Sequence, residues 1–513
     1  MIANVRAWAE RKEISPSFGI IVTVTFVLAL LNLDGLPCWR DEGWTLTVAR
    51  NWVERGYYGM LLSGEPAPPG LAAAFPSVTF TALSFRLLGV GIWQGRLVQL
   101  LFMTGALGFL YVLASRLYNR RVARATVLCA LFLASHLEMN PFYMGRQVLA
   151  EPLMLFFLLA GYWFFWLAFD RIAWMLPAWL MWGIALVAKT QTLPFWVVSL
   201  IAPLLIALIG RQRQAGLRLI VGFVGALVVA QLIPLAQQGI LQTRILPSPI
   251  LSDLVTITAV APNSEVRLFA LSVVLLIGLP TTLGLIYAMR DGLGNWRTFD
   301  LDVRLETVRW MLATLVSSWY AWYLTLSVGW IRYFFPVAFL GSLFVAKFLH
   351  DATAGFSVKS MLDRVGDLVL RRRVNRASVS ALLAMLLLMI FVPLTLQQLG
   401  RLTYRDPWLA QMAQMLNTRT AADALVESYD NEIFFLLNRH YHYPPDSVSV
   451  DLIRRTELGQ VVAILYDPLA ADPDYLVVGN YGRESQLYNP VLASGAVRLL
   501  ERFGPYDVYQ RIR

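Results

Sequence analysis

Two acidic residues stand side by side in a tryptophan-rich stretch, PCWRDEGWTL, at positions 37–46. Asp41 and Glu42 follow Arg40 there, just after the first long apolar run of the chain. Such a carboxylate could take a proton from a hydroxyl group as a general base, or it could be a solvated acid beside a membrane helix. The choice depends on which other charged residues the fold brings near it.

Further ionisable residues lie at the ends of other apolar runs. Glu151 comes one turn into a run and five residues after Arg146, and Lys189 is bracketed by apolar sequence. Arg332 and Tyr333 open a later run. Charged groups at membrane depth usually face a partner or a water-filled cavity, although a basic residue at the end of a span often only reaches the headgroups. Acids and bases at one membrane face make an electrostatic site plausible.

The composition describes a polytopic membrane protein. Of 513 residues, 57% are hydrophobic and 15% are charged, and the mean hydropathy is +0.57. The net charge of +10 could suggest nucleic acid, but the basic residues cluster in short loops such as 211–218 and 359–376. That pattern marks cytoplasmic loops of a protein in a lipid bilayer, so we expect no nucleic-acid partner. Cys38 lies in a loop and Cys129 in an apolar run, which argues against a disulfide.

Hydropathy predicts an all-α transmembrane domain with about eleven helices. The predicted spans lie near 15–33, 95–117, 122–137, 148–169, 172–188, 192–210, 217–238, 266–289, 308–328, 331–349 and 378–398. The first apolar run is long and no cleavage site follows it, so we expect an uncleaved span with a cytoplasmic N-terminus.

The predicted topology divides the chain into residues 1–398, in the membrane, and 399–513, outside it. The outer loop 34–94 is expected to form short helices along the membrane surface, since it alternates apolar pieces with SGEPAPPG. Beyond 399 the sequence changes to short strand and helix patterns broken by Pro and Gly, which predicts a small extracytoplasmic α/β domain. We expect a multi-pass protein of the inner or plasma membrane.

Six motifs occur in a characteristic order and spacing. They are RDEGW, PAPPG, LLGVGIWQGRLVQLL, GRQVLAEPLMLFF, GIALVAKTQTLPF and WIRYFFPV. Over roughly the first 350 residues the chain therefore resembles the GT-C glycosyltransferases that use polyprenyl-phosphate sugars, a group that includes protein O-mannosyltransferases and the lipid A aminoarabinose transferase. The resemblance implies a membrane enzyme that moves a hexose or pentose from this lipid donor to a lipid, glycan or protein acceptor.

The resemblance also implies roles for individual acids. Asp41 matches the first-loop acid expected to be the catalytic base, with Glu42 beside it. Glu151, preceded by Arg146, matches an acid at the start of the fourth span, where many members have Asp. Relatives often carry a basic residue before the paired prolines, whereas this chain has Glu65 in that neighbourhood.

The resemblance assigns the basic residues to the donor phosphate. Lys189 matches the lysine of a TKG-like stretch, although KTQ replaces the usual KGP. Arg332 and Tyr333 match an RY motif. We expect Arg332 and Lys189 to hold the phosphate, with Arg146 and Arg96 as the next candidates.

The chemistry agrees with these residue types. A phosphomonoester leaving group needs cations rather than a proton donor, and an attacking hydroxyl needs one carboxylate base. One base suffices for direct displacement, so we expect inversion at the anomeric carbon. No organic cofactor is expected. A divalent cation between Asp41, Glu42 and Glu151 is an alternative source of positive charge, and the metal requirement stays open.

Two other functions remain open from the sequence. A lipid-linked sugar transporter or flippase would also carry intramembrane charges, but it typically shows internal repeats and a site near the midplane. A non-catalytic envelope-assembly subunit would present the outer domain as a binding module. That domain could contribute to acceptor choice through the aromatic stretch NRHYHYPP at 438–445, which could equally be an ordinary strand and turn.

Overall fold

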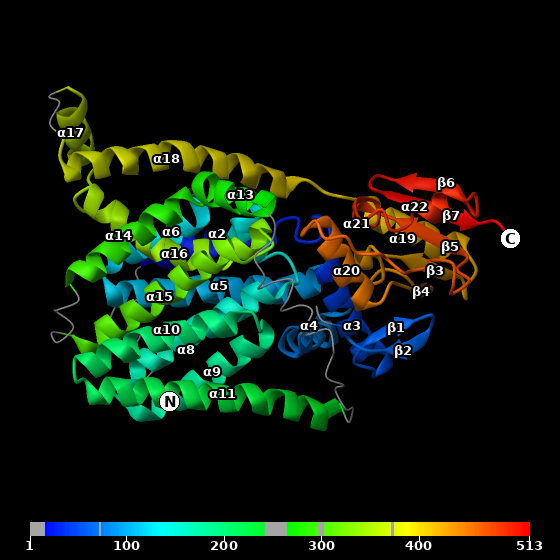
Figure 1. The fold of residues 1–513 in the computed structure, drawn as a ribbon, viewed down its shortest axis with the longest axis horizontal. Helices are drawn as coiled ribbons and strands as arrows, with labels where there is room; N and C mark the ends of the chain where they lie inside the picture. The colour runs from blue at the N-terminus through cyan, green and yellow to red at the C-terminus, as the bar shows by residue number, and fades with distance from the viewer. Residues whose placement is uncertain (1–15, 71–72, 242–263, 296–301, 371–373) are drawn as a thin grey trace.

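The computed structural model describes residues 16–70, 73–241, 264–295, 302–370 and 374–513. A bundle of long helices carries a small sheet domain at one end (Figure 1). The chain enters this domain after the last long helix, and the first loop of the chain lies against it. The amphipathic helix α17 (Val358–Val369) lies at the opposite end of the bundle.

Every segment predicted to span the membrane is helical. The bundle helices are α2 (Pro16–Leu30), α5 (Ile92–Leu117), α6 (Arg120–Phe132), α8 (Ala150–Ala168), α9 (Met175–Ala188), α10 (Thr192–Ile209), α11 (Arg213–Leu241), α13 (Ser264–Ser272), α14 (Leu279–Asn295), α15 (Val303–Thr325), α16 (Ile331–Ala352) and α18 (Arg376–Gly400). Among the described residues, six helices are long and apolar enough to cross a membrane, or up to seven if a bent pair counts as one. The structure supports a multi-pass membrane protein but not the count of eleven.

The bent pair lies where the sequence predicts one straight span over 266–289. Ser264–Ile277 and Leu279–Asp291 meet at an angle of 82°, after the π-helical turn η3 (Val273–Ile277). Gly278 and Pro280 flank the break. Proline has no backbone N–H to donate and its ring crowds the preceding turn, so a sharp bend is expected here.

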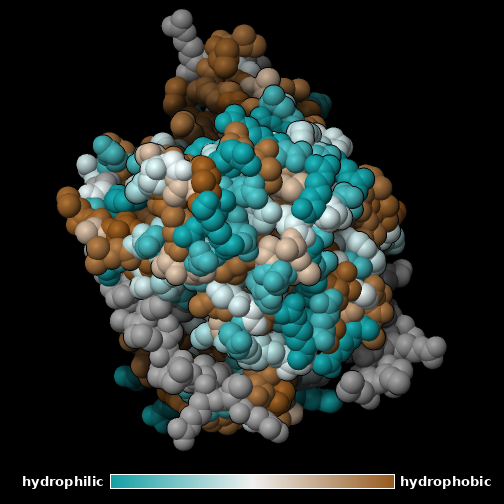
Figure 2. All heavy atoms as spheres, turned by 90° about the vertical axis from the view of Figure 1, so that its right-hand side faces the viewer, coloured by the Kyte–Doolittle hydropathy of each residue, from teal (hydrophilic) through white to brown (hydrophobic). Residues whose placement is uncertain are grey.

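The outer faces of the bundle are apolar, as contact with lipid requires. Leu205 and Ile209 on α10 and Leu232 on α11 are all exposed. The end of the molecule that carries the sheet domain is different: its face is largely hydrophilic, with hydrophobic side chains gathered at the margins (Figure 2).

The sheet domain, called the outer domain below, follows α18. Its elements are η5 (Arg401–Thr403), α19 (Trp408–Arg419), β3 (Leu425–Ser428), η6 (Asn431–Ile433), β4 (His440–His442), α20 (Asp446–Thr456), β5 (Tyr475–Val478), α21 (Asn480–Glu484), α22 (Asn489–Ala493), β6 (Val497–Phe503) and β7 (Tyr506–Arg511). The strand order is β4-β3-β5-β7-β6, with β4, β3 and β5 parallel and β7 antiparallel to both neighbours.

The first loop folds against the outer domain. It forms α3 (Arg40–Arg55), α4 (Phe75–Leu88) and a hairpin of β1 (Met60–Leu62) and β2 (Glu65–Ala67). Trp44 and Leu46 of α3 share one buried cluster with Phe434 and Tyr441 of the outer domain. The expected short helices are present as α3 and α4, and α3 buries much of its surface in a core that the first loop and the outer domain build together. Their position along the membrane surface stays a prediction.

This core also accounts for the stretch NRHYHYPP. Tyr441 is 4% exposed, and its ring stacks on Phe434 with centroids 4.4 Å apart. Tyr443 is buried as well. The two tyrosines of the stretch are therefore packed in the core around β4 and are not available to stack on a sugar, whereas the His440 side chain is exposed.

Candidate functional site

Asp41 lies in the first turn of α3, at the junction between the bundle and the outer domain (Figure 1). The N-terminus of a helix carries a partial positive charge that favours an acid there. One carboxylate oxygen, Oδ2, accepts from Nη2 of Arg332 at 2.7 Å. The Asp41 side chain is 39% exposed, so a ligand can reach it.

A second ion pair lies beside the first. Glu151, in the first turn of α8, accepts from Nζ of Lys189 at 2.5 Å, and Lys189 directly follows α9. The Lys189 ammonium lies 5.4 Å from the centroid of the Tyr333 ring, and the Arg332 guanidinium lies 5.6 Å from the same centroid. The structure thus brings together five residues from four segments that are far apart in the sequence.

The surrounding charges act on the protonation of Asp41. Burial by itself would raise the pKa of this carboxyl group. The positive charges of Arg332, Arg40 and Lys189 outweigh burial, so the pKa of Asp41 lies below its ordinary value of 3.8. Asp41 is therefore ionised at neutral pH and can accept a proton.

Glu42 occupies a different environment from its neighbour. Its side chain is 0% exposed, and its two oxygens accept from Nε and Nη2 of Arg96 at 2.7 and 2.8 Å. The same oxygens accept from the backbone N–H groups of Trp39 at 3.2 Å and Val148 at 3.0 Å. Glu42 accepts four hydrogen bonds and has no exposed surface, so it is placed to hold α3 on the bundle. This buried position differs from the catalytic position that we expected for it beside Asp41.

Arg96 and Arg146 are also absent from the group around Asp41. Arg96 is 0% exposed and donates to Glu42 and to the carbonyl groups of Leu33, Leu36 and Pro37. Arg146 is buried and donates to the carbonyl groups of Leu31, Asn32 and Leu402. Both arginines donate to backbone carbonyl groups of the chain that leads into α3. Their assignment to the phosphate stays a prediction.

The structure adds residues that sequence reasoning did not select. Trp39 donates through Nε1 to the Tyr143 hydroxyl at 3.1 Å, and its ring lies 5.2 Å from the Arg332 guanidinium. Glu138 accepts from the backbone N–H of Arg332 at 3.1 Å. The available signal was the position of Glu138 directly after a predicted span, on the loop that leads to Glu151.

The three acids named as candidate cation ligands each have a basic partner. Asp41 faces Arg332, Glu42 faces Arg96 and Glu151 faces Lys189. In the part of the chain that the structure describes, no three His, Cys, Asp or Glu side chains form a group that could hold a metal ion. The cationic groups that the structure places near Asp41 are Arg332, Arg40 and Lys189.

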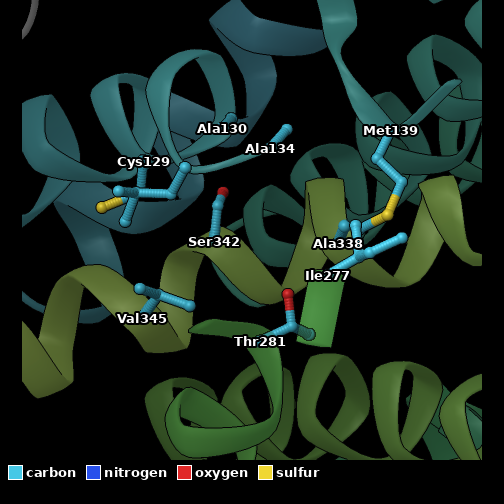
Figure 3. A pocket seen from close by; sticks show the side chains of 10 residues that line it. Cys129, Ala130, Ala134, Met139, Ile277, Thr281, Ala338, Ser342 and Val345 are labelled. Atoms are coloured by element: carbon cyan, nitrogen blue, oxygen red, sulfur yellow. The ribbon is translucent and has the colours of Figure 1, made fainter. Parts of the chain in front are cut away.

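Two hollows in the described part of the bundle lie apart from these ion pairs. One is lined by residues of α6 and α16, including Cys129, Ala130 and Ser342, together with Thr281 of α14 (Figure 3). Its volume is about 10 Å³, which is at the lower limit for one water molecule. A hollow of about 560 Å³ lies between α14 and α15, and none of its lining residues belongs to the ion pairs.

Comparison with known proteins identifies the architecture. Residues 76–236 match the family model described as dolichyl-phosphate-mannose-protein mannosyltransferase. ArnT from Cupriavidus metallidurans bound to undecaprenyl phosphate superposes with a TM-score of 0.61 at 15% identity, covering 97% of this chain and 99% of that one. The chain has the GT-C fold.

Other solved GT-C structures agree. ArnT in the apo state gives a TM-score of 0.58 at 15% identity, with 97% of this chain and 98% of that chain covered. The archaeal oligosaccharyltransferase AglB from Archaeoglobus fulgidus, in complex with an inhibitory peptide and a dolichol-phosphate, gives 0.53 at 11% identity and covers 96% of this chain and 74% of that one. No curated protein matches in sequence. The resemblance to polyprenyl-phosphate-dependent GT-C glycosyltransferases is confirmed.

Proposed function

We propose that the protein is an integral-membrane glycosyltransferase that moves a sugar from a polyprenyl-phosphate donor to an acceptor hydroxyl, with inversion and with Asp41 as general base. The observation that carries this proposal is the pairing of an accessible, ionised carboxylate with Arg332, beside a second cation, Lys189. A base and two phosphate-binding cations are the groups that this transfer requires.

The reaction assigns a place to each proton and electron pair. The acceptor hydroxyl attacks the anomeric carbon while Asp41 takes its proton. The bond between the anomeric carbon and the phosphate oxygen breaks, and its electron pair stays on that oxygen. Arg332 and Lys189 stabilise the phosphate charge that develops, Arg332 through two parallel N–H groups. No proton donor is needed for this leaving group.

The ion pairs also suggest how donor binding prepares the base. The donor phosphate is a diester with one negative charge, like a carboxylate, and it gains a second charge as the bond to the anomeric carbon breaks. Its oxygens compete with Asp41 for Arg332 and with Glu151 for Lys189, and the competition strengthens as the second charge develops. Weakening of the pair with Arg332 then frees Asp41 to accept the proton of the acceptor. In this scheme Glu151 positions Lys189, and Tyr333 keeps the two cations apart with its ring.

The neighbouring structures support the donor class. ArnT was solved with undecaprenyl phosphate and AglB with a dolichol-phosphate. The charge pattern supports one orientation in the membrane. Basic residues gather around α17, which favours the cytoplasmic side for it, and the outer domain lies at the opposite end of the bundle (Figure 1). We infer that the acceptor is extracytoplasmic and that the N-terminus is cytoplasmic.

The test incubates the purified protein with a panel of polyprenyl-phosphate hexoses and pentoses and measures release of polyprenyl phosphate by mass spectrometry. We expect release from at least one donor, and loss of release in Asp41→Asn. Asp34→Asn is the matched control, because Asp34 is an acid of the same loop whose ion pair with Arg405 is exposed.

The same preparation distinguishes the alternatives. Movement of labelled donor between the leaflets of a proteoliposome without release of polyprenyl phosphate would make the protein a transporter. Absence of both activities, with Asp41→Asn behaving like the wild-type protein in cells, would leave a non-catalytic subunit. Either result would overturn the proposed transferase.

A further inference from the structure

The helix turn that carries Asp41 is held by the outer domain. Arg40, the residue before it, donates through Nη1 to the Tyr429 hydroxyl at 2.8 Å and through Nη2 to the Ser449 hydroxyl at 3.0 Å. Its guanidinium also lies 3.9 Å from the centroid of the Tyr429 ring. These contacts cross 389 and 409 residues of sequence, so they exist only when the outer domain is docked.

The backbones of the two parts also meet at this turn. A Cβ atom added to Gly43 would lie 2.2 Å from the Cα of Glu432, which no real contact allows. Glycine is therefore required for η6 to approach α3 this closely. Because Gly43 is two residues beyond Asp41, the outer domain restrains the turn from both sides.

The outer domain contacts the cation side of the site as well. Val450 and Leu458 share a buried cluster with Val328, in the loop that leads into α16, and Trp330 packs at its edge. Ser449, which accepts from Arg40, directly precedes Val450 in α20. Consecutive residues of one outer-domain helix thus contact the segment before Arg332 and the residue before Asp41.

We propose that the outer domain is a structural part of the active site, in which α20 and Arg40 set the position of Asp41 relative to Arg332. This proposal rests on the proposed function. Arg40 is a positioning residue, because its two hydroxyl partners hold its guanidinium away from the reacting atoms. Catalytic groups lose about 10²-fold in rate when they are displaced by roughly 1 Å, so the tether has a measurable effect on turnover.

The chain offers a matched control in Arg50. This arginine also lies on α3 and ties it to the outer domain, donating to the carbonyl groups of Phe435 at 2.8 Å and Leu437 at 3.1 Å and to Oδ1 of Asn438 at 2.7 Å. It lies ten residues beyond Arg40, about 15 Å along the helix. If these arginines served only to dock the outer domain, replacing Arg40 or Arg50 would have the same effect on turnover.

The experiment compares Arg40→Met, Arg40→Lys and Arg50→Met in the full-length purified protein. Arg40→Met should lower kcat about 10- to 100-fold with the donor KM changed by less than about threefold, and Arg40→Lys should recover part of the loss. Arg50→Met should keep kcat within about twofold. Normal kcat in a folded Arg40→Met protein, or equal losses in Arg40→Met and Arg50→Met, would overturn the proposal.

A second readout does not depend on activity. Hydrogen exchange of the backbone amides in residues 38–46 should accelerate in Arg40→Met and stay at the wild-type rate in Arg50→Met. Should Arg40→Met fail to fold, Tyr429→Phe removes one of the two bonds and should shift kcat and exchange less, in the same direction. If exchange is faster in Arg40→Met but the wild-type protein transfers no sugar, the proposed function is rejected and the structural role of Arg40 is kept. If the wild-type protein is active and exchange in Arg40→Met is unchanged, the role of Arg40 is rejected.

Discussion

Asp41 and Glu42 are adjacent acids for which the structure predicts opposite phenotypes. Asp41 is partly exposed and pairs with one arginine, so Asp41→Asn should lower the free energy of unfolding by only about 0–1 kcal/mol. As a general base, its loss should slow sugar transfer by about 10² to 10⁴, which corresponds to roughly 3 to 5 kcal/mol of activation free energy.

Glu42→Gln should have the reverse effect. Its pair with Arg96 is 0% exposed on both sides, and removing one partner of such a pair costs about 3–5 kcal/mol because a buried charge is left without its counter-charge. That is a large part of the roughly 5–15 kcal/mol that stabilises a typical protein. We expect Glu42→Gln to express poorly and to unfold at lower temperature, while the molecules that fold retain turnover.

The assay measures turnover per folded molecule at saturating donor, together with the thermal midpoint from tryptophan fluorescence in the same detergent. The double variant Glu42→Gln/Arg96→Met is the control, because it removes both buried charges. Its loss of unfolding free energy should be smaller than the sum of the losses in the two single variants. A stable but inactive Glu42→Gln protein, next to a fully active Asp41→Asn protein, would refute the reasoning and move the base to Glu42.

Three further predictions follow from the site and the topology. Replacing Arg332 or Lys189 by Met should weaken binding of polyprenyl phosphate, measured by calorimetry in detergent; normal binding by both variants would place the phosphate elsewhere. The pKa of Asp41 lies below 3.8 because nearby cations outweigh its burial, so kcat should stay level as pH falls to about 4 and decline only below that. Arg332→Met loses the cation that lowers this pKa most, so its kcat should begin to decline at a higher pH. The same pH dependence in both proteins would exclude Asp41 as the titrating group. In intact cells a membrane-impermeant maleimide should label a cysteine introduced at Ala422 but not one at Gly366, and the reverse pattern would overturn the topology.

The sequence by itself determined the helical bundle and the position of most site residues along it. Charged residues such as Glu151 and Lys189 stand out at the ends of apolar runs because an ionised group in a bilayer is costly unless it has a partner or water. The order of the motifs around them was enough to indicate the GT-C fold. The sharp bend near Gly278 was not predicted, since hydropathy measures how apolar a segment is and not its direction.

The tertiary structure decided the partners and the division of roles between neighbours. Successive residues on a helix point about 100° apart, so Asp41 and Glu42 face different surroundings although they are adjacent in the chain. Which of them is buried depends on Arg96 and on the chain that packs around it. The contact of Arg40 with Tyr429 joins residues 389 positions apart, and a single sequence contains no signal for such a pair. Composition and periodicity report local environment, whereas the geometry of this site depends on the docking of the outer domain.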